Sequence, residues 1–329
     1  MKLAHRRQFL HLAVGAAALP AISRIARAQA YPTRPVRVII PFTPGGPTDI
    51  FGRLMAQKLS ERLRTQFYVE NVGGAGGNIG TVRAAKANPD GSTILIVSSS
   101  YVVNPALFEN IPYDPIKDFD PVTCAVTTPM VLAVHPSLPV NTLQELFTLA
   151  KANPDKYSYA SGGVGSPGHL AGAQLRLSLG VDFVHVPFKS AGDAITSTIG
   201  GHTLISIVAA APTEPQIKEG RLRGLAVLGA ARLSTLPKVP TMAEAGYPNI
   251  LGENWFGVVV PTGTPKAIIA LLNQEIIRIL MLPDFTERIG ALGFGVVGST
   301  PEEFGKQIDV ETEKWAKVIK AANIKPDQN

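Results

Sequence analysis

The sequence predicts an α/β fold made of two domains. Apolar, strand-like runs alternate with amphipathic helical segments across short turns, which is the pattern of α/β layers. Two glycine-rich stretches each stand between a predicted strand and a predicted helix, one in each half of the chain. The chain has 329 residues. Removing the N-terminal segment described below leaves about 300 residues, enough to bury the cores of two domains.

Residues 1–30 have the features of a cleaved export signal. Arg6 and Arg7 precede a short apolar stretch at residues 12–19, and the segment ends on small residues around Ala30. A basic start, a short apolar centre and a small-residue end are typical of export signals, and paired arginines before Phe-Leu resemble the twin-arginine type. The alternative is an amphipathic N-terminal helix. We expect a periplasmic protein cleaved near Ala30.

Charge excludes several partners. The formal net charge is +6, but residues 1–30 hold five basic residues and no acidic ones, so 26 basic residues face 25 acidic ones in the remainder. A nearly neutral chain without Lys/Arg runs gives no case for nucleic acid or an anionic membrane as partner. Cys124 is the one cysteine and cannot form an internal disulfide. Its apolar surroundings predict a small core residue.

The first strand-loop-helix unit lies at residues 36–63. The β-branched run at residues 36–40 predicts a strand buried on both faces. Pro41, Pro44 and the Gly45-Gly46 pair then end it, and Pro47 and Asp49 suit a helix start. Main-chain N–H groups at a helix start that follows a strand can bind an anion. The alternative is an ordinary strand-to-helix turn.

The rest of the first domain follows in order. Residues 67–70 predict a strand, the glycine cluster at residues 71–80 fits neither G-x-G-x-x-G nor a P-loop, and residues 79–87 predict a helix. Residues 93–97 predict a buried strand. It ends in three serines, Ser98 to Ser100, which either line a pocket or form a solvated loop. Residues 121–134 predict a strand interrupted by proline.

The second domain repeats the opening unit. After a helix that begins at Asn141, residues 157–161 predict a strand, residues 162–168 a glycine loop, and His169 opens a helix. The remaining expectations are strands at residues 181–186, 204–208 and 224–228, a loop at residues 187–193, and a strand that runs on into residues 209–212.

The last third of the chain returns to the first domain. Residues 255–260 predict the returning strand, a helix runs from Pro265 to Leu280, and Thr300 and Glu303 have capping-box spacing at the start of the last helix. The predicted organisation is residues 1–30 as signal, 31–130 plus 255–329 as domain 1, and 131–254 as domain 2. Two crossings between domains predict a hinge.

Motifs for catalysis are absent from the sequence. No serine has the G-x-S-x-G frame, no histidines have metal-ligand spacing, and no cofactor motif occurs. His169 is singled out as a polar donor to a ligand or carbonyl, with a structural histidine and a general base as alternatives. We therefore expect a binding protein, not an enzyme, with no metal and no cofactor.

Six blocks in chain order carry a family resemblance. They are residues 31–37 with 41–49, 74–80, 88–91, 185–189, 239–248 and 299–304, so the resemblance runs along the whole chain after residue 30. The chain resembles the Bug family, the extracytoplasmic solute receptors of tripartite tricarboxylate transporters. The resemblance implies a type 2 periplasmic binding protein fold, with two α/β domains around a ligand cleft and two crossing strands as hinge. It also implies a monomer that delivers a small carboxylated solute to membrane transporter subunits.

The resemblance also implies where the solute is bound. In the family the ligand carboxylate is held largely by main-chain groups of the first strand-to-helix loop, aided by ordered water. That loop here covers residues 42–49, and the facing loop covers residues 161–169. The residues expected to contact the solute are Phe42, Thr43, Gly45, Gly46, Asp49, Asn78, Ser99, Ser161, Gly163, Ser166, His169, Ala191, Gly192, Asp193 and Ala210.

Three departures from the family pattern leave the solute open. Phe188 replaces the usual tyrosine, residues 190–193 replace a glycine-rich continuation, and Leu204 replaces an acid. Asp193 either caps the following helix or faces the cleft, where it would favour a solute with a donor or positive group. An amino or amide-bearing acid and an aromatic carboxylate both remain open. The alternative function is a sensing subunit of a membrane signalling protein, without transport.

Overall fold

The computed structural model describes residues 31–153, 156–250 and 252–326. Contacts between residues divide the chain into two units, and the second unit, which begins at Arg34, holds all the strands and helices described here. The predicted export signal at residues 1–30 lies outside the described residues. No helix among the described residues is both long enough and apolar enough to span a membrane.

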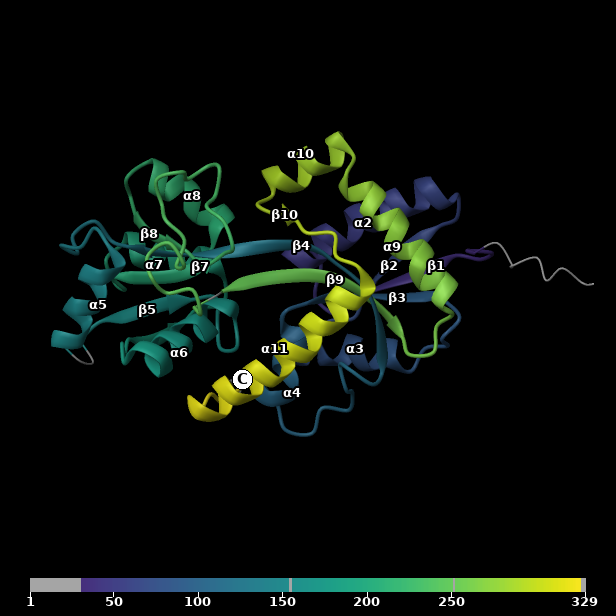
Figure 1. The fold of residues 1–329 in the computed structure, drawn as a ribbon, viewed down its shortest axis with the longest axis horizontal. Coiled ribbons are helices and arrows are strands. Elements are labelled where there is room, and N and C mark those ends of the chain that lie inside the picture. Colours follow the sequence, from purple (N-terminus) through teal and green to yellow (C-terminus); the bar gives the residue numbers. More distant parts are fainter. Residues whose placement is uncertain (1–30, 154–155, 251, 327–329) are drawn as a thin grey trace, which may run out of the picture. The chain divides into compact units, whose positions relative to one another are not determined.

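Strands and helices alternate along the described chain, as the sequence predicts (Figure 1). The strands are β1 (Val36–Ile40), β2 (Phe67–Asn71), β3 (Thr93–Ser98), β4 (Phe119–Val134), β5 (Ser158–Ser161), β6 (Val184–Pro187), β7 (Ile205–Ala209), β8 (Arg223–Val227), β9 (Glu253–Pro261) and β10 (Gly295–Val296). The helices are α2 (Pro47–Leu63), the 3-10 turn η1 (Ala75–Gly77), α3 (Asn78–Ala85), α4 (Ser100–Leu107), α5 (Leu143–Ala152), α6 (Pro167–Leu179), α7 (Ala191–Ile199), α8 (Ala210–Lys218), α9 (Lys266–Leu280), α10 (Pro283–Ala291) and α11 (Pro301–Ala321).

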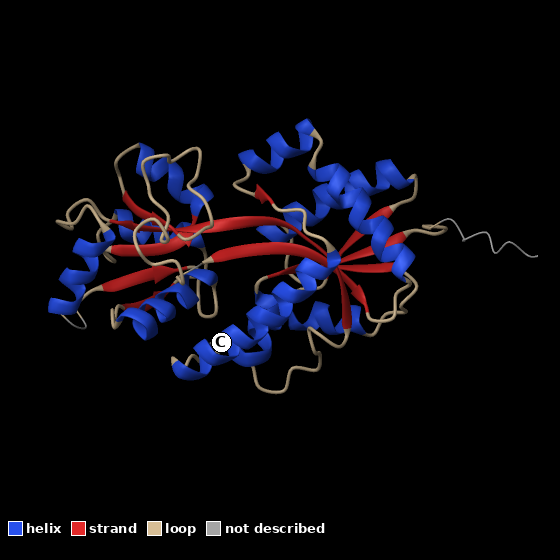
Figure 2. Ribbon diagram, in the orientation of Figure 1, coloured by secondary structure: helices blue, strands red, loops and turns tan. Residues whose placement is uncertain are grey.

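The strands join in the order β2-β1-β3-β9-β4-β7-β5-β6, with β8 and β10 also paired to β4. The pairs of β1 with β2 and β3, and of β5 with β6 and β7, are parallel, whereas β4 and β9 run antiparallel to their neighbours. The long strand β4 changes partners along its length, since residues 119–129 pair with β9 and residues 131–134 with β7 and β8 (Figure 2). This change lies near the domain boundary predicted from the sequence, which stays a prediction.

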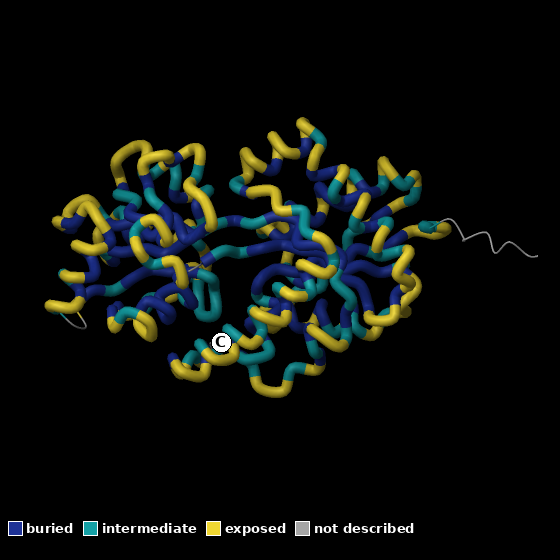
Figure 3. Tube along the Cα trace, in the orientation of Figure 1, coloured by how far each residue is buried: buried dark blue, intermediate teal, exposed yellow. Residues whose placement is uncertain are grey.

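The buried residues are concentrated in the strands of the central sheet, as the dark blue parts of the trace show (Figure 3). The near-continuous apolar run of β1 is buried because helices cover both faces of a parallel sheet; Val38, Ile39 and Ile40 have no exposed surface. Cys124 is 1% exposed, which confirms that it is a core residue. One hydrophobic cluster joins β3, β4, β9, α4 and α11 and also takes in Leu170 of α6.

Three helices differ from the expectation of loop or strand. The serine run continues directly into α4 at Ser100, and the segment after β7 is helix α8. α10 was not predicted. Proline explains part of the difference, because a proline in the first helical turn removes only an N–H that has no partner there. Pro212 and Pro283 both stand in such a first turn.

The predicted strand at residues 181–186 is also wrong in its start. β6 begins at Val184, which pairs with Ser158 of β5, and the predicted loop at residues 187–193 already contains the start of α7. Val181 and Phe183 are buried in the core, so their apolar character reflects packing rather than strand pairing. The capping box at Thr300 and Glu303 is confirmed.

Candidate functional site

The first glycine loop, residues 42–49, connects β1 to α2. Gly46 stands at the N-cap position of α2 in an extended conformation, with no side chain capping the helix, and Pro47 follows at the first helical turn. Because Pro47 has no N–H, the main-chain donors at this helix start are those of Thr48 and Asp49. A methyl group added at Gly46 would meet no atom within 4 Å, so the loop has open space beside this residue.

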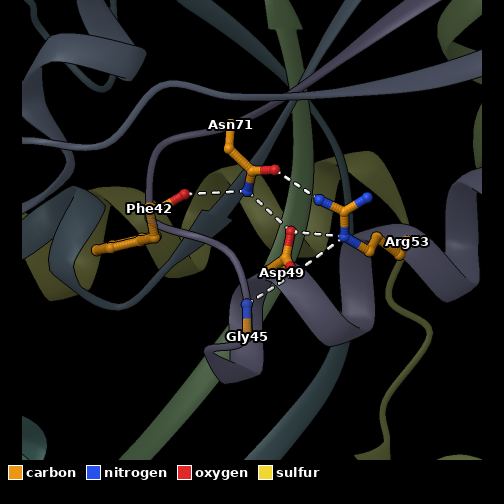
Figure 4. A network of polar contacts seen from close by, with 5 residues as sticks. All are labelled: Phe42, Gly45, Asp49, Arg53 and Asn71. Carbon is orange, nitrogen blue, oxygen red and sulfur yellow. Dashed lines mark hydrogen bonds and ion pairs between the residues drawn. The ribbon is translucent and has the colours of Figure 1, made fainter.

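The carboxylate of Asp49 holds this loop through hydrogen bonds to Gly45, Arg53 and Asn71 (Figure 4). Its Oδ2 accepts the Gly45 N–H at 2.9 Å, and its Oδ1 accepts Nε of Arg53 at 2.9 Å and Nδ2 of Asn71 at 2.8 Å. Asn71 in turn donates to the Phe42 carbonyl at 3.0 Å and accepts from Arg53 Nη2 at 2.7 Å. The network therefore ties both ends of the loop to β2 and α2.

Asp49 is ionised in this network. Burial of the carboxyl group raises its pKa, but hydrogen bonds from Arg53, Gly45 and Asn71 outweigh that effect and the net pKa is lowered. Asp49 is 3% exposed. These three hydrogen bonds fix the shape of the loop. Whether Asp49 also contacts the solute stays a prediction.

The second glycine loop, residues 161–169, connects β5 to α6 and satisfies its own polar groups. The Ser166 side chain caps α6 by accepting the N–H of His169, and His169 Nδ1 accepts the N–H of Gly165 at 3.1 Å. Ser161 is fully buried, and its Oγ lies 2.7 Å from Nε2 of His185. The sequence predicted His169 as a donor to a ligand or a neighbouring carbonyl, whereas this contact makes its Nδ1 an acceptor. Whether His169 contacts the solute stays a prediction.

His185 of β6 lies stacked on His169, with ring centroids 3.8 Å apart and an interplanar angle of 7°. Burial, with a smaller contribution from His169, lowers the pKa of His185 to about 3. His185 is therefore neutral at neutral pH. The sequence analysis did not single it out, because its place beside Ser161 and His169 depends on the pairing of Tyr159 with His185 across β5 and β6.

Comparison with known proteins identifies the family. Residues 51–324 match the model of the tripartite tricarboxylate transporter family receptor. The chain belongs to this receptor family. BugT of Bordetella pertussis is 37% identical to this receptor over 300 residues, which cover 91% of this chain and 92% of BugT. Members of the family are receptors rather than enzymes, so the expectation of a binding protein is confirmed.

Two solved structures of similar receptors contain carboxylates. A protein of R. palustris with adipate is 33% identical, covers 90% of this chain and 100% of its own, and superposes with a TM-score of 0.76. MatC from Rhodopseudomonas palustris with bound malate is 31% identical, covers 88% of this chain and 100% of its own, and has a TM-score of 0.72. The predicted periplasmic binding protein fold is therefore confirmed.

The remaining predicted positions of the receptor fall into two groups. Near the first loop, Asn78 at the start of α3 accepts from Asn104 Nδ2 at 2.8 Å, and Ser99 donates to Asn254 Oδ1 at 2.8 Å. The glycine cluster before Asn78 packs against the loop, since a methyl group added at Gly77 would lie 3.1 Å from the Phe42 ring. Asn104 and Asn254 were not predicted, and only their positions in the fold reveal them.

Ala191, Gly192 and Asp193 lie near the second loop. They form the first turn of α7, and a methyl group added at Gly162 would be 3.7 Å from the Ala191 nitrogen. The predicted cap role of Asp193 is wrong, because Ser190 is the N-cap of α7. Asp193 is exposed and its carboxylate accepts the Ser190 hydroxyl at 2.8 Å. Whether it contacts the solute stays a prediction.

Other positions complete the picture. Ala210 is buried at the first position of α8, which, like α2, starts without a side-chain cap. Gly165 of the second loop lies against Leu107 of α4, since a methyl group added at Gly165 would lie 2.6 Å from that leucine side chain. No group of histidine, cysteine and acidic residues within the described ranges has the arrangement of a metal site.

Proposed function

We propose that this receptor captures a small carboxylated solute between its two glycine loops in the periplasm and delivers it to a tripartite tricarboxylate-type membrane transporter. The observation that carries the proposal is the uncapped start of α2 beside Gly46. Two main-chain N–H groups at a helix start, next to open space, provide donors and a favourable dipole for a carboxylate. Adipate and malate in the similar receptors support this class of solute.

The bracing of the first loop supports the same proposal. Asp49 accepts hydrogen bonds from the Gly45 N–H and from the side chains of Arg53 and Asn71, and these bonds favour one conformation of the loop. A preformed loop loses little conformational entropy on binding. We infer that the polar side chains around the first loop fix its conformation, and that main-chain N–H groups bind the carboxylate.

Single methyl groups test the site. Gly46→Ala and Gly162→Ala each add a methyl group where the nearest atom is at least 3.7 Å away and the backbone is ordinary for alanine. Gly290→Ala on α10 is the matched control, because its added methyl group also meets nothing within 4 Å. Binding of adipate, malate and a panel of other di- and tricarboxylates is measured by isothermal titration calorimetry.

The expected result is binding of at least one acid by wild type, with the affinity reduced at least about tenfold in Gly46→Ala and unchanged in Gly290→Ala. Saturation at one hundred times the dissociation constant should raise the free energy of unfolding by about 2.7 kcal/mol. The dimethyl ester of the bound acid should not stabilise the protein. Equal binding of acid and ester, or wild-type affinity in Gly46→Ala, would refute the carboxylate site.

Export and delivery are tested separately. Replacing Arg6 and Arg7 by lysine should leave uncleaved precursor inside the cell if the signal is of the twin-arginine type. The protein isolated from the periplasm should begin near Tyr31. Loss of the receptor should abolish uptake of its radiolabelled solute, and uptake at the wild-type rate would contradict delivery to a transporter.

A further inference from the structure

A cavity of about 330 Å³ lies beside the second glycine loop, between α6 and the segment that follows α11. Val164 and His169 of the loop form part of its lining, and Arg176 lies farther along α6. The opposite wall is made by residues 322–325. Arg176 joins the two walls, because its Nη2 donates to the Ala322 carbonyl at 2.8 Å. The cavity thus has walls from segments far apart in the sequence.

The lining carries more positive than negative charge. Arg176 and Lys325 are cationic and Asp182 is the one acid among the lining residues. Within the described residues, neither Arg176 nor Lys325 forms an ion pair, and Lys325 makes no hydrogen bond either. Arg176 bonds to a main-chain carbonyl through only one of its nitrogens. Guanidinium and ammonium groups without acidic partners beside a cavity favour a carboxylate.

Aromatic and imidazole rings also line the cavity. His169 and His185 stack face to face, the Tyr159 and His185 rings have centroids 5.0 Å apart, and Phe183 lies edge-on to Tyr159 at 6.5 Å. His185 is neutral at neutral pH, as its lowered pKa shows. A lining that combines flat rings with two cations suits a ligand with an apolar body and one anionic end.

We propose that this cavity is a second binding site, specific for a small aromatic monocarboxylate, and that its occupancy alters the affinity of the solute site. The coupling, which rests on the proposed function, follows from shared residues. Val164 and His169 line the cavity and also belong to the second glycine loop. A ligand that holds α6 against residues 322–325 acts on that loop directly, so the two binding free energies are linked.

Benzoate is the probe for the cavity itself. Its binding is measured by calorimetry and by ligand-observed NMR, with benzamide and acetate as probes that lack the charge or the ring. We expect benzoate to bind more tightly than either. Arg176→Gln and Lys325→Gln should each weaken benzoate binding, Arg176→Gln by at least about tenfold, while Arg176→Lys should lose less.

Arg288→Gln on α10 and Lys151→Gln on α5 are the matched controls, because both side chains are exposed on helices away from the cavity. Both should bind benzoate as wild type does. Since Arg176→Gln also removes the bond to Ala322, thermal unfolding checks that the variant is folded, and Lys325→Gln tests the charge without that bond. Equal benzoate affinity in wild type and Lys325→Gln, or equal binding of benzoate and benzamide, would overturn the site.

The coupling is tested with the dicarboxylate that binds best. Saturating benzoate should change its dissociation constant at least about threefold, and the dicarboxylate should change the benzoate constant by the same factor. The effect should disappear in Arg176→Gln and persist in Arg288→Gln. Simple competition between the two acids would overturn the second site, and an unchanged constant would overturn the coupling. Failure of every acid in the panel to bind would refute the proposed function, whereas benzoate binding would still decide the cavity.

Discussion

Both glycine loops join a strand to a helix through a glycine-rich turn, but their polar side chains have different roles. In the first loop Asp49 accepts a hydrogen bond from the Gly45 N–H, and no side chain caps the start of α2. In the second loop Ser166 caps α6 from within and His169 takes the Gly165 N–H. The first loop therefore offers main-chain donors, whereas the second is held rigid by its own side chains.

The largest expected effect concerns the rigidity of the second loop. A methyl group added at Gly168 would lie 2.0 Å from the Ile207 carbonyl oxygen, whereas one added at Gly162 would have its nearest atom at 3.7 Å. Because a main-chain oxygen cannot move aside cheaply, Gly168→Ala should lower the free energy of unfolding by about 3 kcal/mol or more, and Gly162→Ala by far less. Urea unfolding of both variants measures this. Equal stability of the pair would show that the loop tolerates displacement.

The next effect is a pH dependence of stability that arises from His185 beside the second loop. The pKa of His185 falls from 6.5 to about 3 on folding, so below about pH 6.5 the unfolded chain binds a proton that the folded chain does not. Stability should therefore decrease as pH falls through this window, by on the order of 2–3 kcal/mol at pH 4. His185→Gln removes the titrating group and should flatten this part of the profile.

The control for the pH experiment is His202→Gln, which changes an exposed histidine outside both loops. Its stability profile between pH 7 and pH 4 should follow that of wild type. A His185→Gln profile as steep as wild type would show that His185 is not the group responsible.

A third, smaller effect compares two acids. Asp49→Asn removes the charge that accepts hydrogen bonds from Arg53, Asn71 and Gly45 and should cost about 1–3 kcal/mol of unfolding free energy. Asp193→Asn changes an exposed carboxylate bonded to Ser190 and should cost less than about 0.5 kcal/mol. Unfolding at pH 7 measures both. If Asp193→Asn instead changes the preference between dicarboxylates and amino-bearing acids, Asp193 contacts the solute.

The smallest expected effect comes from exchanging caps. Gly46→Ser supplies the missing cap of α2 and Ser166→Gly removes the cap of α6, so stability should rise slightly in the first variant and fall slightly in the second, by a few tenths of a kcal/mol. Solute affinity should fall in Gly46→Ser, because the new side chain competes for the same N–H groups. Gly46→Ser with unchanged affinity would argue against main-chain recognition at α2.

The sequence was sufficient where the signal is local. The β1–α2 unit, the serine-bearing second loop and the capping box at Thr300 all depend on residues a few positions apart, and all three strand-helix or cap assignments agree with the structure. Arg53 lies four residues after Asp49 on one helix face, so that ion pair was readable too.

Residues brought together by strand pairing were not predictable in this way. Asn71 reaches the first loop because β2 lies parallel to β1, with Asn71 opposite Ile40. His185 reaches Ser161 only through the register of β5 and β6. The helices α4 and α8 were missed because serines or prolines at a helix start resemble a loop when neither the strand end nor the packing is known.

The partner change along β4 has a consequence for folding. β4 and β9 are separated in the sequence by β5 to β8. The pairing of Phe119 with Pro261 can therefore form only after the residues between them have been synthesised. Pairings with such long sequence separation raise contact order and slow folding, because loop-closure entropy is lost before contacts compensate it. Until β9 is synthesised, residues 119–129 of β4 lack this partner strand, whereas residues 131–134 can already pair with β7 and β8. Pro121 and Pro129 within β4 lack the N–H that a foreign strand would need, which disfavours pairing of this part of β4 with another chain.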